Sequence, residues 1–351
     1  MRIKHIILFV TLRCDSNCVM CFNNKTNFLE RNELTLEEYH KIASNIKKKL
    51  KSIMISGGEP SLREDLPEIC KVFNEHCGVD KIHIPFNGHD KRRTIQTVRR
   101  IIELCPNTAL NIAFSIDGIG NVHDAQRGTP GSFKRVIDTY QETFDFVKDN
   151  NKVKIGITTV VTKLNFKQLG EFIDYVFNLK KQPDYHSIML CRIQYGSSID
   201  SALLLSPKEY IDLLDLSNRH QLFYCKKIHG SIILGLIRYS YHRILNHIYL
   251  NANINRRIIE CKAQEFMRVI DADGAVRICE SKSPEGNIRD CDYSLEKMDI
   301  MLGLSRKKFK CVCTHPCFIV PSLQYPSNII KACISLLSGK KYLKTAGKTR
   351  E

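Results

Sequence analysis

Hydrophobic residues along the chain alternate between short β-branched runs and longer stretches with helical periodicity. The short runs have the length and side chains typical of strands. They cover residues 3–10, 52–56, 81–85, 109–116, 153–161 and 186–193. Between them lie amphipathic stretches with the period of a helix. These cover residues 36–50, 65–76, 91–104, 133–150 and 166–180. The pattern predicts strands and helices in alternation.

Local signals mark where helices begin. Thr35 and Glu38 form a capping box, and Ser206, followed by Pro207 and Glu209, starts a further helix after the sixth strand. Six strand-then-helix units imply parallel strands joined by right-handed crossovers. We therefore expect an α/β fold, either an open doubly wound sheet or a partial (β/α)6 TIM-like barrel.

Unusual polar and glycine residues follow the end of every predicted strand. In chain order they are Cys14, Cys18 and Cys21; Gly57, Gly58 and Glu59; Asn87 and Gly88; Ser115, Asp117 and Gly118; Thr158, Thr159 and Thr162; and Arg192 and Gln194. Active sites of (β/α) barrels gather at the carboxyl ends of the strands. This placement favours the partial barrel, with one site on that rim.

A second cysteine group lies toward the C-terminus. Apolar runs 266–270 and 275–278 flank an Asp-Gly turn and predict a hairpin that returns Cys279 toward Cys261. More thiols follow at Cys311, Cys313 and Cys317. We expect a small cysteine-rich β-hairpin module after the barrel. The predicted divisions are a core barrel (1–225), a helical insertion or linker (226–258), the cysteine module (259–335) and a basic tail (336–351).

Composition narrows the setting. The 351 residues are 43% hydrophobic, enough for a sizeable core. Fifteen cysteines are spread over a large chain and clustered at metal-ligand spacings, which favours a reducing cytoplasm over a disulfide framework. The net charge of +16 favours acidic partners, although solvated helix faces account for most of the lysines. Arg238, His242 and Arg243 interrupt the apolar stretch 231–250, so we expect no membrane span.

The first cysteine group has the spacing C-x3-C-x2-C. Three thiolates on one loop can hold three irons of a cubane cluster and leave the fourth iron without a protein ligand. Zinc is the alternative, but a structural zinc site uses four ligands. The ligand count favours an iron-sulfur cluster.

Together, C-x3-C-x2-C, Gly57-Gly58-Glu59-Pro60 and Ser115-Ile116-Asp117-Gly118 resemble the motifs of radical S-adenosylmethionine (radical SAM) enzymes over about residues 5–195. The resemblance implies that the three cysteines ligate a 4Fe-4S cluster that chelates SAM. By the same resemblance the remaining motif residues contact SAM: Gly57, Gly58 and Glu59 its amino group, and Ser115, Asp117 and Arg127 its ribose and carboxylate, with Asn87 as a further contact. Met20 stands where the family usually has an aromatic residue, and it would pack on adenine.

The C-terminal cysteines resemble the SPASM and shorter twitch extensions of these enzymes. The full SPASM pattern C-x2-C-x5-C-x3-C is absent, which favours one auxiliary 4Fe-4S cluster held by Cys261, Cys279, Cys317 and Cys313, the last preferred over Cys311. A tetrathiolate zinc site from the same residues is the alternative. Cys291 and Cys333 are unassigned.

The resemblance implies reductive cleavage of SAM to a 5'-deoxyadenosyl radical that abstracts hydrogen from a substrate. We expect an oxidoreductase or maturase that oxidises or cross-links a peptide or protein, with an electron donor such as flavodoxin or ferredoxin. One alternative is a small-molecule or sugar dehydrogenase of the twitch type. Another is a zinc-stabilised nucleic-acid-binding protein, although no specific nucleic acid is expected for the enzyme.

Overall fold

The computed structural model describes residues 3–23, 32–192, 197, 199–206, 208–213, 215–217, 220, 261–307 and 322. The chain divides into two compact units. The first combines Met1–Leu204 with Gln264–Lys307, and the second combines Leu205–Ala263 with Lys308–Glu351. In the second unit, Ser206 and Glu209 form the predicted capping box, since each side chain bonds the backbone amide of the other. The sheet and its helices belong to the first unit.

One sheet forms the centre of the first unit. Its strands are β1 (His5–Thr11), β2 (Ser52–Gly57), β3 (Lys81–Phe86), β4 (Ala109–Ser115), β5 (Val153–Val161), β6 (Tyr185–Leu190), β7 (Met267–Ile270), β8 (Ala275–Arg277) and β9 (Gly286–Asn287). Their order is β6-β5-β4-β3-β2-β1-β7-β8-β9. Strands β1 to β6 are parallel neighbours, which confirms the predicted α/β fold with a partial, open barrel.

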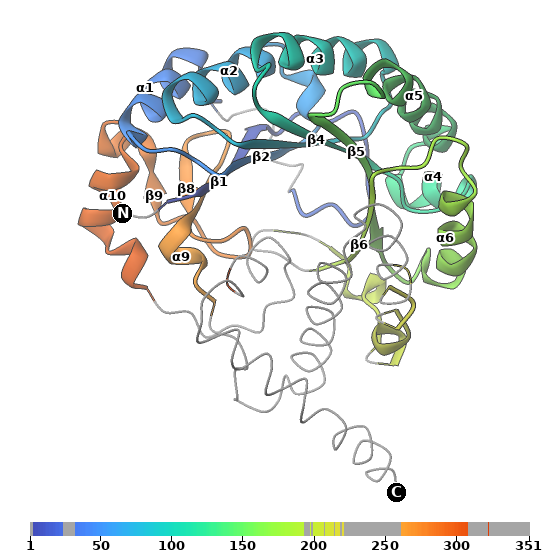
Figure 1. The fold of residues 1–351 in the computed structure, drawn as a ribbon. Helices are drawn as coiled ribbons and strands as arrows, with labels where there is room; N and C mark the ends of the chain where they lie inside the picture. The colour runs from blue at the N-terminus through green and yellow to red at the C-terminus, as the bar shows by residue number, and fades with distance from the viewer. Residues whose placement is uncertain are drawn as a thin grey trace, which may run out of the picture. The chain divides into compact units, whose positions relative to one another are not determined.

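Helices follow one another along the outer side of this sheet (Figure 1). They are α1 (Leu36–Ile46), α2 (Leu66–Cys77), α3 (Lys91–Leu104), α5 (Ser132–Val147) and α6 (Leu169–Phe177). Alternate strand residues face them, as the edge-to-face contact at 5.7 Å between Phe114 of β4 and Tyr140 of α5 shows. Burial of these aliphatic and aromatic rows against the helices is the main source of the fold's stability.

Three helical predictions differ from the structure. α1 ends at Ile46 because Lys47 adopts a left-handed conformation with φ 48°. The stretch predicted as one helix over 166–180 divides into a 3-10 turn (Phe166–Gln168) and α6. A short helix that the sequence did not predict, α4 (Asn121–Arg127), lies between Gly120 and Gly128, both of which have positive φ.

The predicted hairpin forms, but it continues the main sheet. β7 and β8 pair antiparallel around the Asp-Gly turn, and β7 pairs in parallel with β1, with His5 opposite Met267 and Leu8 opposite Ile270. Arg289, just beyond β9, then forms a bidentate ion pair with Glu38 of α1 at 2.6 and 3.1 Å. Residues 264–307 therefore belong to the same compact unit as the barrel, whereas the sequence placed them in a separate 259–335 module.

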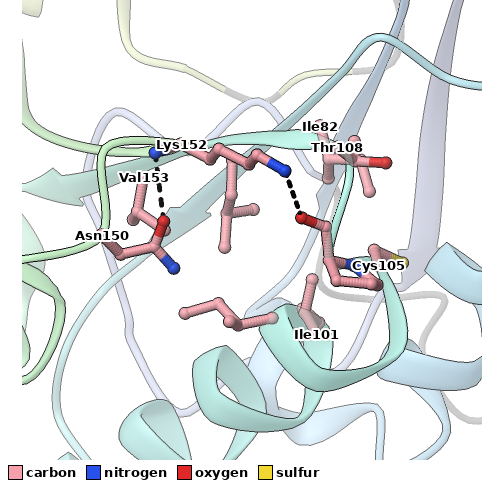
Figure 2. A pocket seen from close by; sticks show the side chains of 10 residues that line it. Ile82, Ile101, Cys105, Thr108, Asn150, Lys152 and Val153 are labelled. Atoms are coloured by element: carbon pink, nitrogen blue, oxygen red, sulfur yellow. Dashed lines mark hydrogen bonds between the residues drawn. The ribbon is translucent and has the colours of Figure 1, made fainter.

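The amino ends of the strands are closely packed. A hollow of about 20 Å³ lies there between the C-terminal end of α3 and β3, β4 and β5 (Figure 2), room for about one water. Lys152 crosses it and donates to the carbonyl oxygen of Pro106 at 2.9 Å. In the part of the chain that the structure describes, no helix is long and apolar enough to cross a membrane.

Candidate functional site

The three N-terminal cysteines lie on the loop that follows β1, at the carboxyl end of the sheet. Within this cysteine loop (residues 12–21), the Ser16 amide donates to Cys14 Sγ at 3.4 Å and the Cys21 amide to the Cys18 carbonyl oxygen at 3.3 Å. Desolvation raises the pKa of the Cys14 thiol to about 12; the Ser16 amide opposes the shift, and charges on Cys18 and Glu59 add to it. Several ionised groups brought this close together require a bound cation.

The glycine motif at the end of β2 packs directly on the start of the cysteine loop. The Gly58 amide donates to the carbonyl oxygen of Thr11, and the Glu59 amide donates to that of Arg13, each at 2.8 Å. A Cβ on Gly57 or Gly58 would lie 2.1 Å from the Thr11 oxygen or 2.0 Å from the Arg13 oxygen, respectively. Both glycines are thus required by a backbone contact inside the protein. Their predicted contact with SAM stays a prediction.

Glu59 joins the ends of β2 and β3. Its side chain accepts hydrogen bonds from the Ser61 hydroxyl at 2.6 Å and from the Asn87 amide at 2.8 Å. The residue is only 2% exposed, and burial raises its pKa to about 7 while these hydrogen bonds oppose the shift. The carboxylate fixes two strand ends relative to each other, and its predicted bond to the SAM amino group stays a prediction.

Asn87, after β3, connects that strand to the cysteine loop. Its side-chain nitrogen donates to Asp15 Oδ1 at 2.5 Å and to Ser16 Oγ at 3.2 Å, and its oxygen accepts from the His89 amide. The His89 ring lies beside the same loop residues, with Nδ1 3.4 Å from Ser16 Oγ. The sequence analysis missed Asp15, Ser16 and His89, although their positions inside or next to two motifs were the available signal.

Asp117 and Arg127 form a buried ion pair above β4. Arg127 Nε lies 2.6 Å from Asp117 Oδ2, and the two side chains are 11% and 0% exposed. The other carboxylate oxygen of Asp117 accepts from the Val160 amide at 2.8 Å. Arg127 Nη1 also donates to Cys18 Sγ at 3.7 Å. Burial opposes the charge of Arg127, but Asp117 and Cys18 together raise its pKa. The structure therefore connects two predicted SAM contacts to a predicted cluster ligand.

The C-terminal end of α4 supports the cysteine loop from below. The amides of Asn17 and Val19 donate to the carbonyl oxygens of Arg127 and Gln126, at 3.2 and 3.0 Å. A Cβ on Gly128, which has φ +58°, would lie 2.1 Å from the Asn17 oxygen. Since α4 was not predicted, neither was this support.

Two predicted SAM contacts lie elsewhere on the rim. Met20 is 7% exposed and packs against Cys191 and Ile199, so protein atoms cover the side chain expected to face adenine. Ser115 ends β4 opposite Thr158 of β5 and is half-buried. Both residues lie at the carboxyl ends of the strands, and their contacts with SAM stay predictions.

The cysteine loop fits an iron-sulfur cluster better than a single ion. Among the described residues, no three or more His, Cys, Asp or Glu side chains surround one point as ligands of one metal ion would. A four-iron cluster puts each thiolate on a different iron, whereas zinc needs four donors around one centre. The bond from Arg127 to Cys18 is the type of outer hydrogen bond that ligating side chains accept.

The C-terminal cysteines are divided between the two units. Cys279 belongs to the first unit and Cys261 to the second, and both are half-buried. Cys311, Cys313, Cys317 and Cys333 lie outside the described residues. Cys291 is buried, with its sulfur 3.9 Å from Met301 Sδ. The auxiliary ligand set therefore stays a prediction.

Comparison with known sequences gives a family for the barrel. Residues 8–176 match the radical SAM superfamily. An uncharacterised protein of Methanocaldococcus jannaschii is 30% identical over 49% of this chain and 58% of its own length. An AdoMet-dependent heme synthase of Methanosarcina barkeri is 28% identical over 58% of this chain and 55% of its own. The chain thus spans little more than half of these relatives. A GTP 3',8-cyclase of Synechocystis is 23% identical over 86% of this chain and 87% of its own.

Solved structures share the fold. The enzyme anSMEcpe with bound AdoMet superposes with a TM-score of 0.62 at 18% identity, covering 88% of this chain and 83% of that one. Streptococcus suis SuiB bound to its precursor peptide SuiA gives 0.56 at 17% identity, covering 88% and 68%. At these identities the likeness extends to the architecture of the chain.

Proposed function

We propose, from the premise that residues 8–176 form a radical SAM domain, that this chain cleaves SAM reductively and oxidises or cross-links a peptide or protein substrate. One observation carries the first part of the proposal. The loop with Cys14, Cys18 and Cys21 is tied by hydrogen bonds to the motifs that follow β2, β3 and β4. A cluster on this loop would lie at the rim where barrel active sites form.

The side chains of the rim hold this loop in place. Asn87 binds it from the end of β3, Arg127 from α4, and the backbone of Gly58 and Glu59 fixes its first residues. When bound, the 4Fe-4S cluster would supply the electron that cleaves SAM to methionine and a 5'-deoxyadenosyl radical. The residues around it would orient SAM and exclude water and oxygen. An external reductant such as flavodoxin or ferredoxin would deliver the electron.

We further propose one auxiliary 4Fe-4S cluster held by Cys261, Cys279, Cys313 and Cys317, which would accept or relay an electron from the oxidised substrate. A peptide substrate is supported by the fold shared with SuiB, whose structure contains its precursor peptide. A small-molecule substrate is the second candidate. It is favoured by the match to the GTP 3',8-cyclase, which extends over 86% of this chain.

Anaerobic reconstitution tests the proposal. We expect about eight irons per chain from two four-iron clusters, and 5'-deoxyadenosine after addition of SAM and dithionite. The triple change Cys14→Ala, Cys18→Ala and Cys21→Ala is expected to abolish cleavage while far-UV circular dichroism remains unchanged. The matched control is Cys105→Ala, at the end of α3 beside the hollow on the opposite rim, which is expected to retain cleavage. Cleavage by the triple variant would refute the cluster assignment.

Addition of GTP distinguishes the two substrate classes. Formation of 5'-deoxyadenosine that is strongly stimulated by GTP would favour the small-molecule candidate. Formation stimulated only by a peptide fraction, with a mass change in one peptide, would favour the peptide candidate.

A further inference from the structure

The strongest unassigned feature of the site is the contact between Arg127 and Cys18. The resemblance to radical SAM enzymes places Arg127 against SAM, but in this structure two protein groups hold its guanidinium. Nε pairs with Asp117 at 2.6 Å, and Nη1 donates to Cys18 Sγ at 3.7 Å. Asp117 in turn accepts from the Val160 amide at 2.8 Å, so its carboxylate is fixed from two sides.

We propose that the Asp117–Arg127 pair tunes the reduction potential of the cluster that Cys18 helps to hold. This inference rests on the proposed function, because it requires the N-terminal cluster. Arg127 acts as a positioning residue: it donates to a ligand sulfur and places a positive charge beside it. Asp117 orients the guanidinium and balances part of its charge.

The direction of each effect follows from electrostatics. Reduction adds one negative charge to the cluster, and a nearby positive charge or a hydrogen bond to a ligand sulfur stabilises the reduced form. Arg127 therefore raises the potential. A carboxylate beside the cluster opposes reduction, so Asp117 lowers it. Both side chains are almost completely buried, and water therefore screens these charges only weakly.

The pair also tolerates the substitutions needed to test it. Arg127→Gln removes the charge and keeps a side chain that can donate one hydrogen bond. Asp117→Asn removes the carboxylate charge but keeps an oxygen that can accept from Val160. Arg127→Lys keeps the charge but loses the planar fork that reaches both partners at once. The control is Arg135→Gln on α5, which removes one charge from an exposed side chain.

The experiment is a redox titration of the reconstituted full chain without SAM, followed by the electron paramagnetic resonance signal of the reduced N-terminal cluster. The Cys279→Ser background removes overlap from the auxiliary cluster. We expect Arg127→Gln to lower the midpoint potential, Asp117→Asn to raise it, and Arg127→Lys to fall between Arg127→Gln and the parent. Arg135→Gln is expected to leave the potential unchanged.

A purely structural role of the pair predicts a different result. Both substitutions would then reduce the fraction of chains that assemble a cluster, while the potential of the assembled fraction would match the parent protein. Equal potentials in Arg127→Gln, Asp117→Asn and the parent would overturn this inference and leave the proposed function intact. A parent protein that assembles no cluster on Cys14, Cys18 and Cys21 would overturn both.

Discussion

Replacing Gly58 with alanine is expected to detach the cysteine loop from the end of β2. The added Cβ would lie 2.0 Å from the Arg13 carbonyl oxygen, 2.6 Å from its carbonyl carbon and 2.7 Å from the Leu12 oxygen. All three atoms are backbone, so no side chain can rotate away. Relief of the overlap requires the two segments to separate, which breaks the bonds from the Gly58 and Glu59 amides to Thr11 and Arg13, both 2.8 Å long.

The energy can be estimated from these contacts. Two backbone hydrogen bonds contribute roughly 0.5–1.5 kcal/mol each, and an overpacked site costs about 1–3 kcal/mol. We therefore expect Gly58→Ala to lower the free energy of unfolding by roughly 2–6 kcal/mol. The assay is urea unfolding of the apo protein followed by circular dichroism, since the chain has no tryptophan for fluorescence.

The matched control is Gly170→Ala in α6. An added Cβ there meets no atom within 4 Å, so we expect a change of at most about 1 kcal/mol, toward higher stability. Gly58→Ala is also expected to bind less iron on reconstitution, because the loop that carries the ligands has moved. A Gly58→Ala protein within about 0.5 kcal/mol of wild type would show that the two segments are not in contact as described.

Two further predictions concern the C-terminal part of the first unit. The Arg289 hydrogen bonds lower the pKa of Glu38 from 4.5 to about 2 despite its partial burial, so its charge stabilises the fold above pH 4.5, and this contribution is lost as the pH falls toward 2. Glu38→Gln, which keeps an N3 group for the capping box, is therefore expected to unfold about 1–2 kcal/mol more easily at pH 7 and to match wild type near pH 2 in urea titrations. A difference that does not change with pH would contradict this. Cys279→Ser is expected to lower the iron content from about eight to about four per chain while SAM cleavage continues, and an unchanged iron content would remove the auxiliary-cluster proposal.

The sequence predicted the barrel well because each strand carries its own signal. Every parallel strand is a β-branched run, and the helix after Thr35 begins with the capping box that the structure contains. The strand ends also revealed the rim, since the polar motifs in the chain follow them. These are local properties, and they are visible without tertiary information.

The partners of the rim residues could not be predicted in the same way. Nothing in the sequence indicates that Gly58 contacts Arg13, or that Arg127 reaches Cys18, since both contacts join segments that are distant in the chain. The expectation that the glycines make room for a ligand overlooked the other backbone segment that packs there. α4 escaped prediction because a seven-residue helix is too short for its periodicity to be visible.

The pairing of β1 with β7 has a consequence for how the protein is made. Strand β1 is synthesised first and leads directly to the cysteine loop, but one of its two neighbours is encoded near the far end of the described chain. During synthesis, this edge of β1 stays without its partner until residues 267–270 have left the ribosome, and such long-range pairing forms slowly. An unpaired, apolar strand edge promotes association with other chains. Expression is therefore expected to be sensitive to C-terminal truncation before Ile270, even though the truncated residues lie far from the cysteine loop in sequence.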